Sequence, residues 1–463
     1  MIFSSVPFLM IFLVIVLVLY YLPFRKKHIY RNILLLFSSL FFYAWGEREA
    51  VFVLIFSIII NWGAALFMDR MKAGFPKRLV RDLIVFFDIL ILFVYKYLAF
   101  TLHNIGLVLD KPLDYSVELP IGISFYTFQI ISYILDLYKG QVLVQKNPLN
   151  LGLYVSLFPQ LIAGPIVRYK TVEEEIENRV ENFEDFKQGF FRFVWGLSKK
   201  VLIANSVASL ADAAFGMDER SVLMAWLGAV AYTIQIFFDF SGYSDMAIGL
   251  GRIFGFHFEE NFNYPYISSS ITEFWRRWHI SLSGWFRDYV YIPLGGSRKG
   301  KLKTYRNIFV VWLLTGIWHG ANWTFIVWGL MYFVLLVIEK NINIKKLPAF
   351  VTHIYTMLFV ILGWVIFRAD SLKDAFVYIG NMFGIGVGGI FNADSLVYLS
   401  KYCMYLILGI VCCFPVKSFL EKTIKPGEDL KKAVNSICVV ILFVICLAFI
   451  ISSDYDPFIY FNF

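Results

Sequence analysis

A histidine inside an apolar stretch is the residue of this chain best suited to chemistry. His319 lies in LLTGIWHGANWTFIVWG, and its nearest charged neighbours along the chain are Arg306 and Glu339. An ionisable side chain at membrane depth is costly and is usually functional. Because burial disfavours the imidazolium, we expect a neutral ring that can act as a general base. Position alone also allows a structural histidine.

Small and polar residues around His319 extend this pattern. Thr315, His319 and Asn322 follow one another at i, i+4 and i+7, which predicts a shared face on one helix. Gly316 and Gly320 flank that face, and their lack of side chains should let a substrate approach closely.

A second histidine lies in the aromatic segment TEFWRRWHISLSGWFRDY, residues 272–289. Its large apolar residues recur at helical spacing and its arginines fall elsewhere, which predicts one helix lying in the membrane interface. His279 is one turn from Trp275 and should point toward the apolar face. Spacing alone is equally typical of a histidine with a purely structural hydrogen bond.

Two carboxylates interrupt the apolar stretch IQIFFDFSGYSDMAIG. Asp239 and Asp245 need partners at membrane depth, and Arg276, Arg277 and Arg287 are the candidates. A structural ion pair and a catalytic role both remain open for them.

A basic cluster follows the turn PLGGSRKG. It consists of Arg298, Lys299, Lys301, Lys303 and Arg306. The cluster is typical of a cytoplasmic loop, and it would also attract the phosphates of an anionic donor such as coenzyme A. There is no Walker pattern, so a nucleotide triphosphatase is not supported. No individual donor-binding residue is assigned.

The composition excludes a water-soluble protein. Of 463 residues, 59% are hydrophobic and 16% are charged, whereas soluble domains average about 45–50% and about 25%. We predict an all-α polytopic membrane protein, a single domain over 1–463, with about 10–13 transmembrane or re-entrant helices and interfacial amphipathic helices. The stretch 308–338 would be roughly 46 Å long against about 30 Å of hydrocarbon, so it should be tilted or broken.

Charge and cysteine usage narrow the class further. The net charge of +8 is explained by Lys/Arg-rich loops at 25–31 and 70–81, which should be cytoplasmic. No soluble basic module is visible, so nucleic-acid binding is not supported. The five cysteines lie in apolar stretches without a Cys-x-x-Cys pair, and we predict no metal site.

Several of these segments together resemble the membrane-bound O-acyltransferase family. YPYISSSITEFWRRWHISLSGWFRDYVYIPLGGSRKG and LTGIWHGANWTFIVWG carry the resemblance. The PLGGSRKG turn and DFSGYSDMAIG are similar to the alginate O-acetyltransferase branch. The resemblance implies helices around a central chamber, a thioester donor on the cytoplasmic side and an acceptor reached from outside. It also implies that His319, the histidine of the WHG motif, is catalytic and that His279 is a second active-site residue.

The same resemblance implies a reaction and its partners. Acetyl-CoA would be the donor, with no metal, and the acceptor would be an extracytoplasmic polysaccharide reached from the bacterial cytoplasmic (inner) membrane. A separate extracytoplasmic SGNH-type acetyltransferase is expected as a partner besides membrane lipid. As a hypothesis, Asn322 or nearby backbone amides would stabilise the oxyanion. Transfer through an acyl carrier on the partner is equally allowed.

Two alternatives remain open at this point. The first is the D-alanine transfer branch of the same family, which modifies teichoic acid from a carrier-protein thioester and shares both histidine motifs. The second is a polytopic transporter or flippase, which would also contain buried charges and broken helices. Against a transporter, the chain has no paired halves, and its unusual residues concentrate in one stretch.

Overall fold

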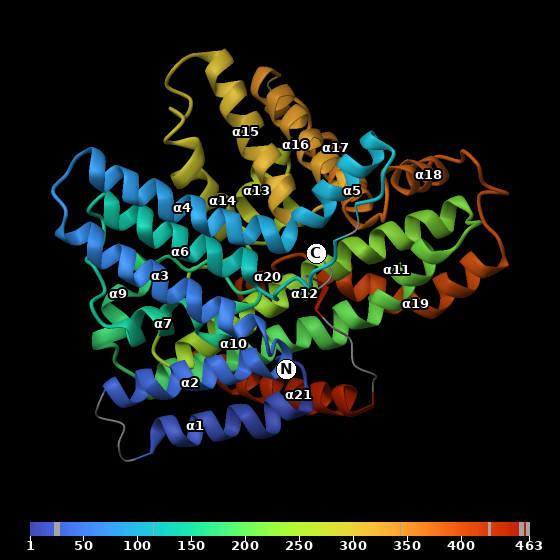
Figure 1. Cartoon of the computed structure of the whole chain (residues 1–463). Helices are drawn as coiled ribbons and strands as arrows, with labels where there is room; N and C mark the ends of the chain where they lie inside the picture. The colour runs from blue at the N-terminus through green and yellow to red at the C-terminus, as the bar shows by residue number, and fades with distance from the viewer. Residues whose placement is uncertain (23–27, 114, 343, 425–426, 453–457, 460–463) are drawn as a thin grey trace. The chain divides into compact units, whose positions relative to one another are not determined.

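The computed structural model describes residues 1–22, 28–113, 115–342, 344–424, 427–452 and 458–459, and all regular structure in these ranges is helical (Figure 1). Residues 25–27 of the first predicted cytoplasmic loop lie outside them. The described chain divides into two compact units. Unit 1 comprises 1–193 and 243–259, and unit 2 comprises 194–242 and 260–463.

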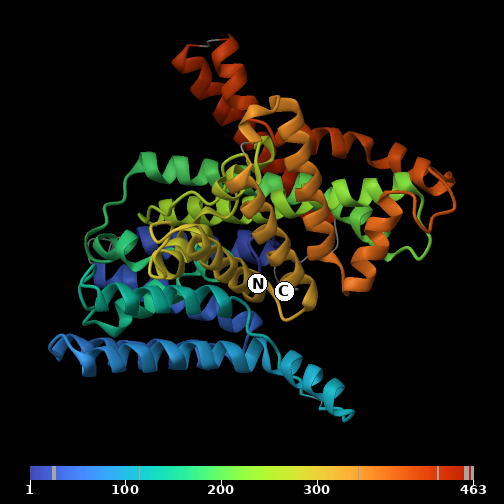
Figure 2. The ribbon, with the colours of Figure 1, turned by 90° about the horizontal axis from the view of Figure 1, so that it is seen from above.

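Unit 1 consists of long apolar helices and the short helices that connect them. They are η1 (Pro7–Phe12), α1 (Leu13–Tyr21), α2 (His28–Gly46), α3 (Ala50–Arg70), α4 (Phe75–Lys96), α5 (Leu98–Leu109), α6 (Ile123–Tyr138), α7 (Pro148–Ser156), α8 (Phe158–Leu161), α9 (Tyr169–Asn178) and the start of α10 (Phe183–Ser198). α4 and α5 meet at a bend of 64°, and Figure 2 shows α5 turning away from the line of α4. The apolar stretch 149–166 likewise contains two helices, α7 and α8.

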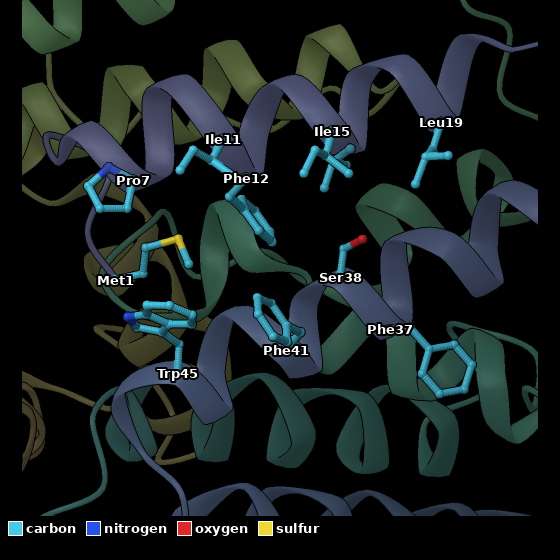
Figure 3. Close-up of a pocket in the computed structure, with 11 residues that line it drawn as sticks. Met1, Pro7, Ile11, Phe12, Ile15, Leu19, Phe37, Ser38, Phe41 and Trp45 are labelled. Atoms are coloured by element: carbon cyan, nitrogen blue, oxygen red, sulfur yellow. The ribbon is translucent and has the colours of Figure 1, made fainter.

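An apolar groove of about 390 Å³ runs between α1 and α2 (Figure 3). Its walls include Ile11, Phe12, Ile15, Phe41 and Trp45. Such a wall suits lipid chains and offers no general base. The groove therefore belongs to the lipid-facing surface and not to the chemistry.

Unit 2 carries both histidine motifs. After the end of α10 its elements are η3 (Lys199–Ala204), α11 (Asn205–Gly216), most of α12 (Val222–Ile253), η4 (Pro265–Ile267), α13 (Ile271–Arg277), α14 (Ile280–Phe286), η5 (Arg287–Tyr291), α15 (Lys301–His319), α16 (Trp323–Asn341), η6 (Ile344–Lys346), α17 (Ala349–Arg368), α18 (Leu372–Met382), α19 (Ala393–Cys412), α20 (Val416–Ile424) and α21 (Glu428–Ser452). In Figure 1, α15, α16 and α17 lie side by side, and α13 packs on α16 and α17.

Length and apolar composition make this a multi-pass membrane protein. Among the described residues, six helices can cross a membrane, namely α3, α12, α16, α17, α19 and α21, and the bent α4–α5 pair would make a seventh. The all-helical polytopic fold is therefore confirmed. Fewer helices meet the length and hydropathy criteria than the ten to thirteen segments expected, because several apolar stretches are broken into short pieces or carry charge.

Candidate active site

The predicted break in the stretch 308–338 is confirmed, and it forms a helical hairpin. α15 ends at His319, and α16 begins at Trp323. The two helices touch backbone to backbone, because a Cβ at Gly316 would lie 2.5 Å from the Phe325 carbonyl oxygen and one at Gly329 would lie 2.5 Å from the Trp312 oxygen. The hairpin therefore fixes the end of α15 tightly against α16.

The space around the glycines is not open to a substrate. A Cβ at Gly320 would lie 2.1 Å from the ring of Phe325, and Gly316 abuts the backbone of the same residue. The expectation that Gly316 and Gly320 clear a path for a substrate is therefore wrong. These glycines instead let α16 approach the chain beside His319.

His319 is the last residue of α15 and is 4% exposed. Its ring lies edge-to-face against three aromatic rings, with centroids 5.0 Å from Trp318, 5.1 Å from Trp328 and 5.2 Å from Phe367. These rings come from α15, α16 and α17, so three neighbouring helices define the position of the imidazole.

His279 lies at a break between two helices. The predicted single interfacial helix over 272–289 is wrong, because α13 ends at Arg277 and α14 begins at Ile280. His279 has φ 45° and ψ 56°, in the left-handed region that few residues other than glycine adopt. Because of this turn, the His279 side chain does not take the direction expected on a continuous helix. The imidazole is buried and is 1% exposed.

Asn261 holds the His279 ring and defines its tautomer. The Asn261 Oδ1 atom accepts hydrogen bonds from the Ser281 amide at 3.3 Å and the Ser281 hydroxyl at 2.9 Å, and lies 3.1 Å from His279 Nδ1. The Ser281 amide can only donate, so the atom of Asn261 that faces it is the amide oxygen. That oxygen can only accept, and His279 Nδ1 must therefore carry a proton and donate it. The other ring nitrogen, Nε2, is then the basic one.

The His279 ring is neutral at physiological pH. Burial lowers the pKa of His279 to about 3. The ring packs edge-to-face on Phe240 at 4.7 Å. An apolar wall on one side and an amide on the other suit an imidazole that stays neutral and offers Nε2 as a hydrogen-bond acceptor.

Trp318 brings the two histidines into one aromatic cluster. Its ring centroid lies 6.1 Å from that of His279 and 5.0 Å from that of His319. The structure therefore places both sequence-predicted histidines around the same indole, within unit 2.

Asn322 does not share a helix face with the histidine. Because α15 ends at His319, the predicted common face of Thr315, His319 and Asn322 is wrong. The Asn322 side chain caps α16 by accepting from the Thr324 amide at 3.1 Å, and its Nδ2 donates to the Asp370 carbonyl at 2.9 Å. These contacts fix the start of α16.

The two carboxylates in the apolar stretch have other partners than predicted. Asp239 pairs with Lys200 at 2.6 Å in unit 2, and Asp245 pairs with Arg192 at 2.6 Å in unit 1. The candidate arginines bond locally, Arg277 to Glu273 at 3.0 Å and Arg287 to Asp288 at 2.7 Å. The pairing predicted from the charge pattern is therefore wrong, because the fold brings cations that precede these carboxylates in the chain into contact with them, and not the arginines that follow them.

The basic cluster is accessible to an anion in solution. Its five residues, Arg298, Lys299, Lys301, Lys303 and Arg306, are all exposed. Among the described residues, no group of three His, Cys, Asp or Glu side chains is arranged to hold a metal ion.

Sequence reasoning missed Asn261 and Trp318. Asn261 begins the polar stretch NFNYPYISSS, and one asparagine among several polar residues has no special pattern. Trp318 directly precedes His319 in the WHG motif, so its position was visible, but its second contact with His279 depends on the turn at 278–279.

Comparison with known proteins identifies the family. The model of the membrane-bound O-acyltransferase family matches residues 37–372. The chain is 40% identical over 491 residues to the probable alginate O-acetylase AlgI of Pseudomonas putida, with 100% of both chains covered. It is 36% identical over 440 residues to the peptidoglycan O-acetyltransferase of Helicobacter pylori, covering 87% of this chain and 82% of that relative.

A more distant relative belongs to another branch. The teichoic acid D-alanyltransferase of Bacillus subtilis is 32% identical over 269 residues, which covers 53% of this chain and 68% of the relative. This chain belongs to the membrane-bound O-acyltransferase family and is an O-acyltransferase. The resemblance of this chain to that family, and to its alginate O-acetyltransferase branch, is thereby confirmed.

Proposed function

We propose that this protein takes acetyl from cytoplasmic acetyl-CoA and delivers it across the bacterial cytoplasmic membrane for O-acetylation of an extracytoplasmic polysaccharide. The observation that carries the chemistry is the pair of buried histidines around Trp318. The acetyl and polysaccharide assignments are supported by full-length similarity to an alginate O-acetylase and by similarity to a peptidoglycan O-acetyltransferase.

In the proposed reaction, His319 is the general base. It takes the proton of an attacking hydroxyl as the hydroxyl oxygen bonds to the thioester carbonyl carbon. The carbon–sulfur bond then breaks, and the leaving thiolate receives the proton from the imidazolium, which gives an ester and free coenzyme A. His279 presents Nε2 as an acceptor for a second hydroxyl of the polysaccharide and so orients the attacking one, because Asn261 holds the proton on Nδ1.

The surroundings of the histidines support further roles. Asn322 acts as a positioning residue, because it caps α16 and ties it to Asp370. We assign the phosphates of coenzyme A to the exposed basic cluster at 298–306, where positive charge would raise the local donor concentration. A separate extracytoplasmic SGNH-type acetyltransferase would receive the acetyl group or pass it to the polysaccharide.

The test is label transfer by the purified full-length protein. Wild-type protein with acetyl-labelled coenzyme A should lose the thioester and label an added hydroxyl acceptor, whereas His319→Ala should abolish transfer while the protein still folds. Normal transfer by folded His319→Ala would refute the role of His319.

The donor decides between the two branches of the family. D-Alanyl transfer is the second candidate, since the teichoic acid enzyme is 32% identical to this chain over an alignment that covers 53% of it. Offering the wild-type protein a D-alanyl carrier-protein thioester beside acetyl-CoA separates them. Preference for the carrier thioester would overturn the acetyl assignment, and transport of intact substrate without thioester cleavage would overturn the enzymatic one.

A further inference from the structure

A short C-terminal segment is anchored inside unit 2 by a buried carboxylate. Asp239 on α12 is 1% exposed, and its Oδ1 lies 2.6 Å from Lys200 Nζ. Its Oδ2 accepts a hydrogen bond of 2.8 Å from the backbone amide of Ile459. One carboxylate thus joins η3, α12 and a segment that follows in the chain by more than two hundred residues.

The anchored segment contributes a buried aromatic side chain. Phe458 is 2% exposed, and Ile459 is 6% exposed. The ring of Phe458 packs against Phe240 with centroids 6.1 Å apart. Phe240 follows Asp239 directly in the chain, so the hydrogen bond and the ring contact hold the same turn of α12 from two sides.

Phe240 also packs closely on His279. Its centroid is 4.7 Å from the imidazole at an interplanar angle of 88°. It contacts Phe262 at 5.0 Å as well, and Phe262 follows the asparagine that holds His279 Nδ1. A chain of contacts therefore runs from Asp239 through Phe458 and Phe240 to the imidazole.

The polar contacts at Asp239 are more than burial of the segment at 458–459 needs. A segment that only covers apolar surface needs neither a buried ion pair nor a backbone hydrogen bond, because apolar burial alone is favourable. Leaving a carboxylate in such a place requires Lys200 and the Ile459 amide together to satisfy it.

We propose that Asp239 is a positioning residue for acyl transfer, and that it acts by clamping Phe458 against Phe240 so that the His279 ring is held in its reactive orientation. This inference rests on the proposed function. The clamp orders the catalytic imidazole and touches neither donor nor acceptor. Its loss should lower the rate of the chemical step and leave donor binding largely intact.

The test compares three variants of the full-length protein in detergent or lipid. Phe458→Ala removes the ring and leaves the Asp239–Lys200 pair, and we expect kcat to fall at least about tenfold with less than about a twofold change in KM for acetyl-CoA, because small misplacements of reacting groups are costly. Phe458→Leu should restore much of kcat by refilling the space. Asp239→Asn keeps an acceptor for the Ile459 amide and should be intermediate.

A matched control separates the clamp from a general loss of packing. Leu406 on α19 is also in unit 2 and is 6% exposed, so Leu406→Ala should lower the unfolding midpoint without changing kcat of the folded protein. Wild-type kcat in folded Phe458→Ala would overturn the clamp. So would equal losses of kcat in Leu406→Ala and Phe458→Ala.

The two proposals fail in distinguishable ways. If the wild-type protein transfers no acetyl group, the proposed function fails before any variant is compared. If the wild type is active and Phe458→Ala matches it, only the clamp is wrong. Should Phe458→Ala not fold, the kcat of Asp239→Asn relative to wild type still decides, since an unchanged value would refute the clamp.

Discussion

At the scale of single residues, one amide determines which nitrogen of His279 is basic. The Asn261 oxygen is identified by the Ser281 amide that donates to it, and the same oxygen requires a proton on His279 Nδ1. An imidazole in water exchanges its two tautomers freely, whereas this one is committed to a basic Nε2. The arrangement prepares the ring before any substrate arrives.

Asn261→Asp should move the pH dependence of the reaction. A carboxylate 3.1 Å from Nδ1 favours the imidazolium and raises the pKa of His279. The pH of half-maximal kcat on the acid side should therefore rise by at least about one unit. Since the wild-type ring takes up a proton near pH 3, rates measured from pH 3 to pH 8 in the variant and the wild type would show it.

The controls for this variant are Asn261→Ala and the unfolding midpoint. Asn261→Ala removes the acceptor without adding charge, so it should lower kcat without moving the acid limb in the same direction. If the pH profile of folded Asn261→Asp equals that of the wild type, His279 takes no part in the rate-limiting step.

Burial of His279 also makes stability depend on pH. The folded ring takes up a proton only near pH 3, whereas the unfolded ring does so near pH 6.5, its ordinary value. The folded-state pKa is thus lowered, and its contribution to stability is present above pH 6.5 and lost as pH falls. Relative to His279→Asn, the free energy of unfolding should decrease toward pH 4 by at most about 1.4 kcal/mol per unit.

Denaturant unfolding in detergent between pH 7 and pH 4 measures this difference. Asparagine is the suitable replacement, because it tolerates the left-handed backbone that position 279 requires. Parallel pH curves for the two proteins would show that the ring titrates equally in both states.

At the scale of elements, the helices were predictable and their interruptions only partly so. Continuous apolar stretches such as 50–68 and 350–368 correspond to α3 and α17 within about two residues. The break after His319 was expected, because one helix would exceed the bilayer thickness. The break at 278–279 was not, because the aromatic residues keep helical spacing on both sides of it.

Contacts between distant elements could not be predicted from one sequence. Charge patterns indicate that Asp239 and Asp245 need cations but do not say which cations the fold brings near. Lys200 and Arg192 lie on elements about forty to fifty residues earlier, and nearer arginines looked equally suitable. The candidate site was therefore predictable in its two histidines but not in its supporting residues.

Close packing of the α15–α16 hairpin should make its glycines irreplaceable. In Gly316→Ala the new Cβ would meet the Phe325 carbonyl oxygen at 2.5 Å, and in Gly329→Ala that of Trp312 at 2.5 Å. Each change should destabilise the protein by about 1–3 kcal/mol and lower acyl transfer by shifting the end of α15. The unfolding midpoint and the transfer rate are the two measurements.

Gly63 on α3 is the matched control. A Cβ there would have no neighbour within 4 Å, and alanine favours a helix over glycine by about 0.5–1 kcal/mol. Gly63→Ala should therefore be neutral or slightly stabilising. Equal destabilisation by all three substitutions would show that close helix contact is not the cause.

At the scale of the whole molecule, exposed apolar side chains indicate which surfaces face lipid and not water. Ile441 lies near the middle of α21 and is 52% exposed. Only 11% of the apolar window of this helix is buried within the protein. Lipid must therefore cover most of α21, since water would not tolerate this much exposed hydrocarbon.

Ile441→Arg should impair insertion of α21 into the membrane. An arginine at the centre of a spanning helix costs about 2.5–3.5 kcal/mol, so the inserted fraction should fall severalfold at equal synthesis. Lys432→Arg, near the start of the same helix, keeps its charge and should insert normally. Fractionation of membranes with both variants measures the effect, and equal insertion would mean that α21 does not span.

The hairpin that ends α15 at His319 has a further consequence during biosynthesis. α16 is apolar enough to cross the bilayer by itself, whereas α15, which begins with Lys301, Lys303 and Arg306, is not among the helices that meet that standard. The translocon would therefore not be expected to release α15 alone into the lipid bilayer. We therefore expect α15 to stay in the translocon until α16 has been synthesised. The two helices would then enter the membrane together, and the insertion of His319 would depend on α16.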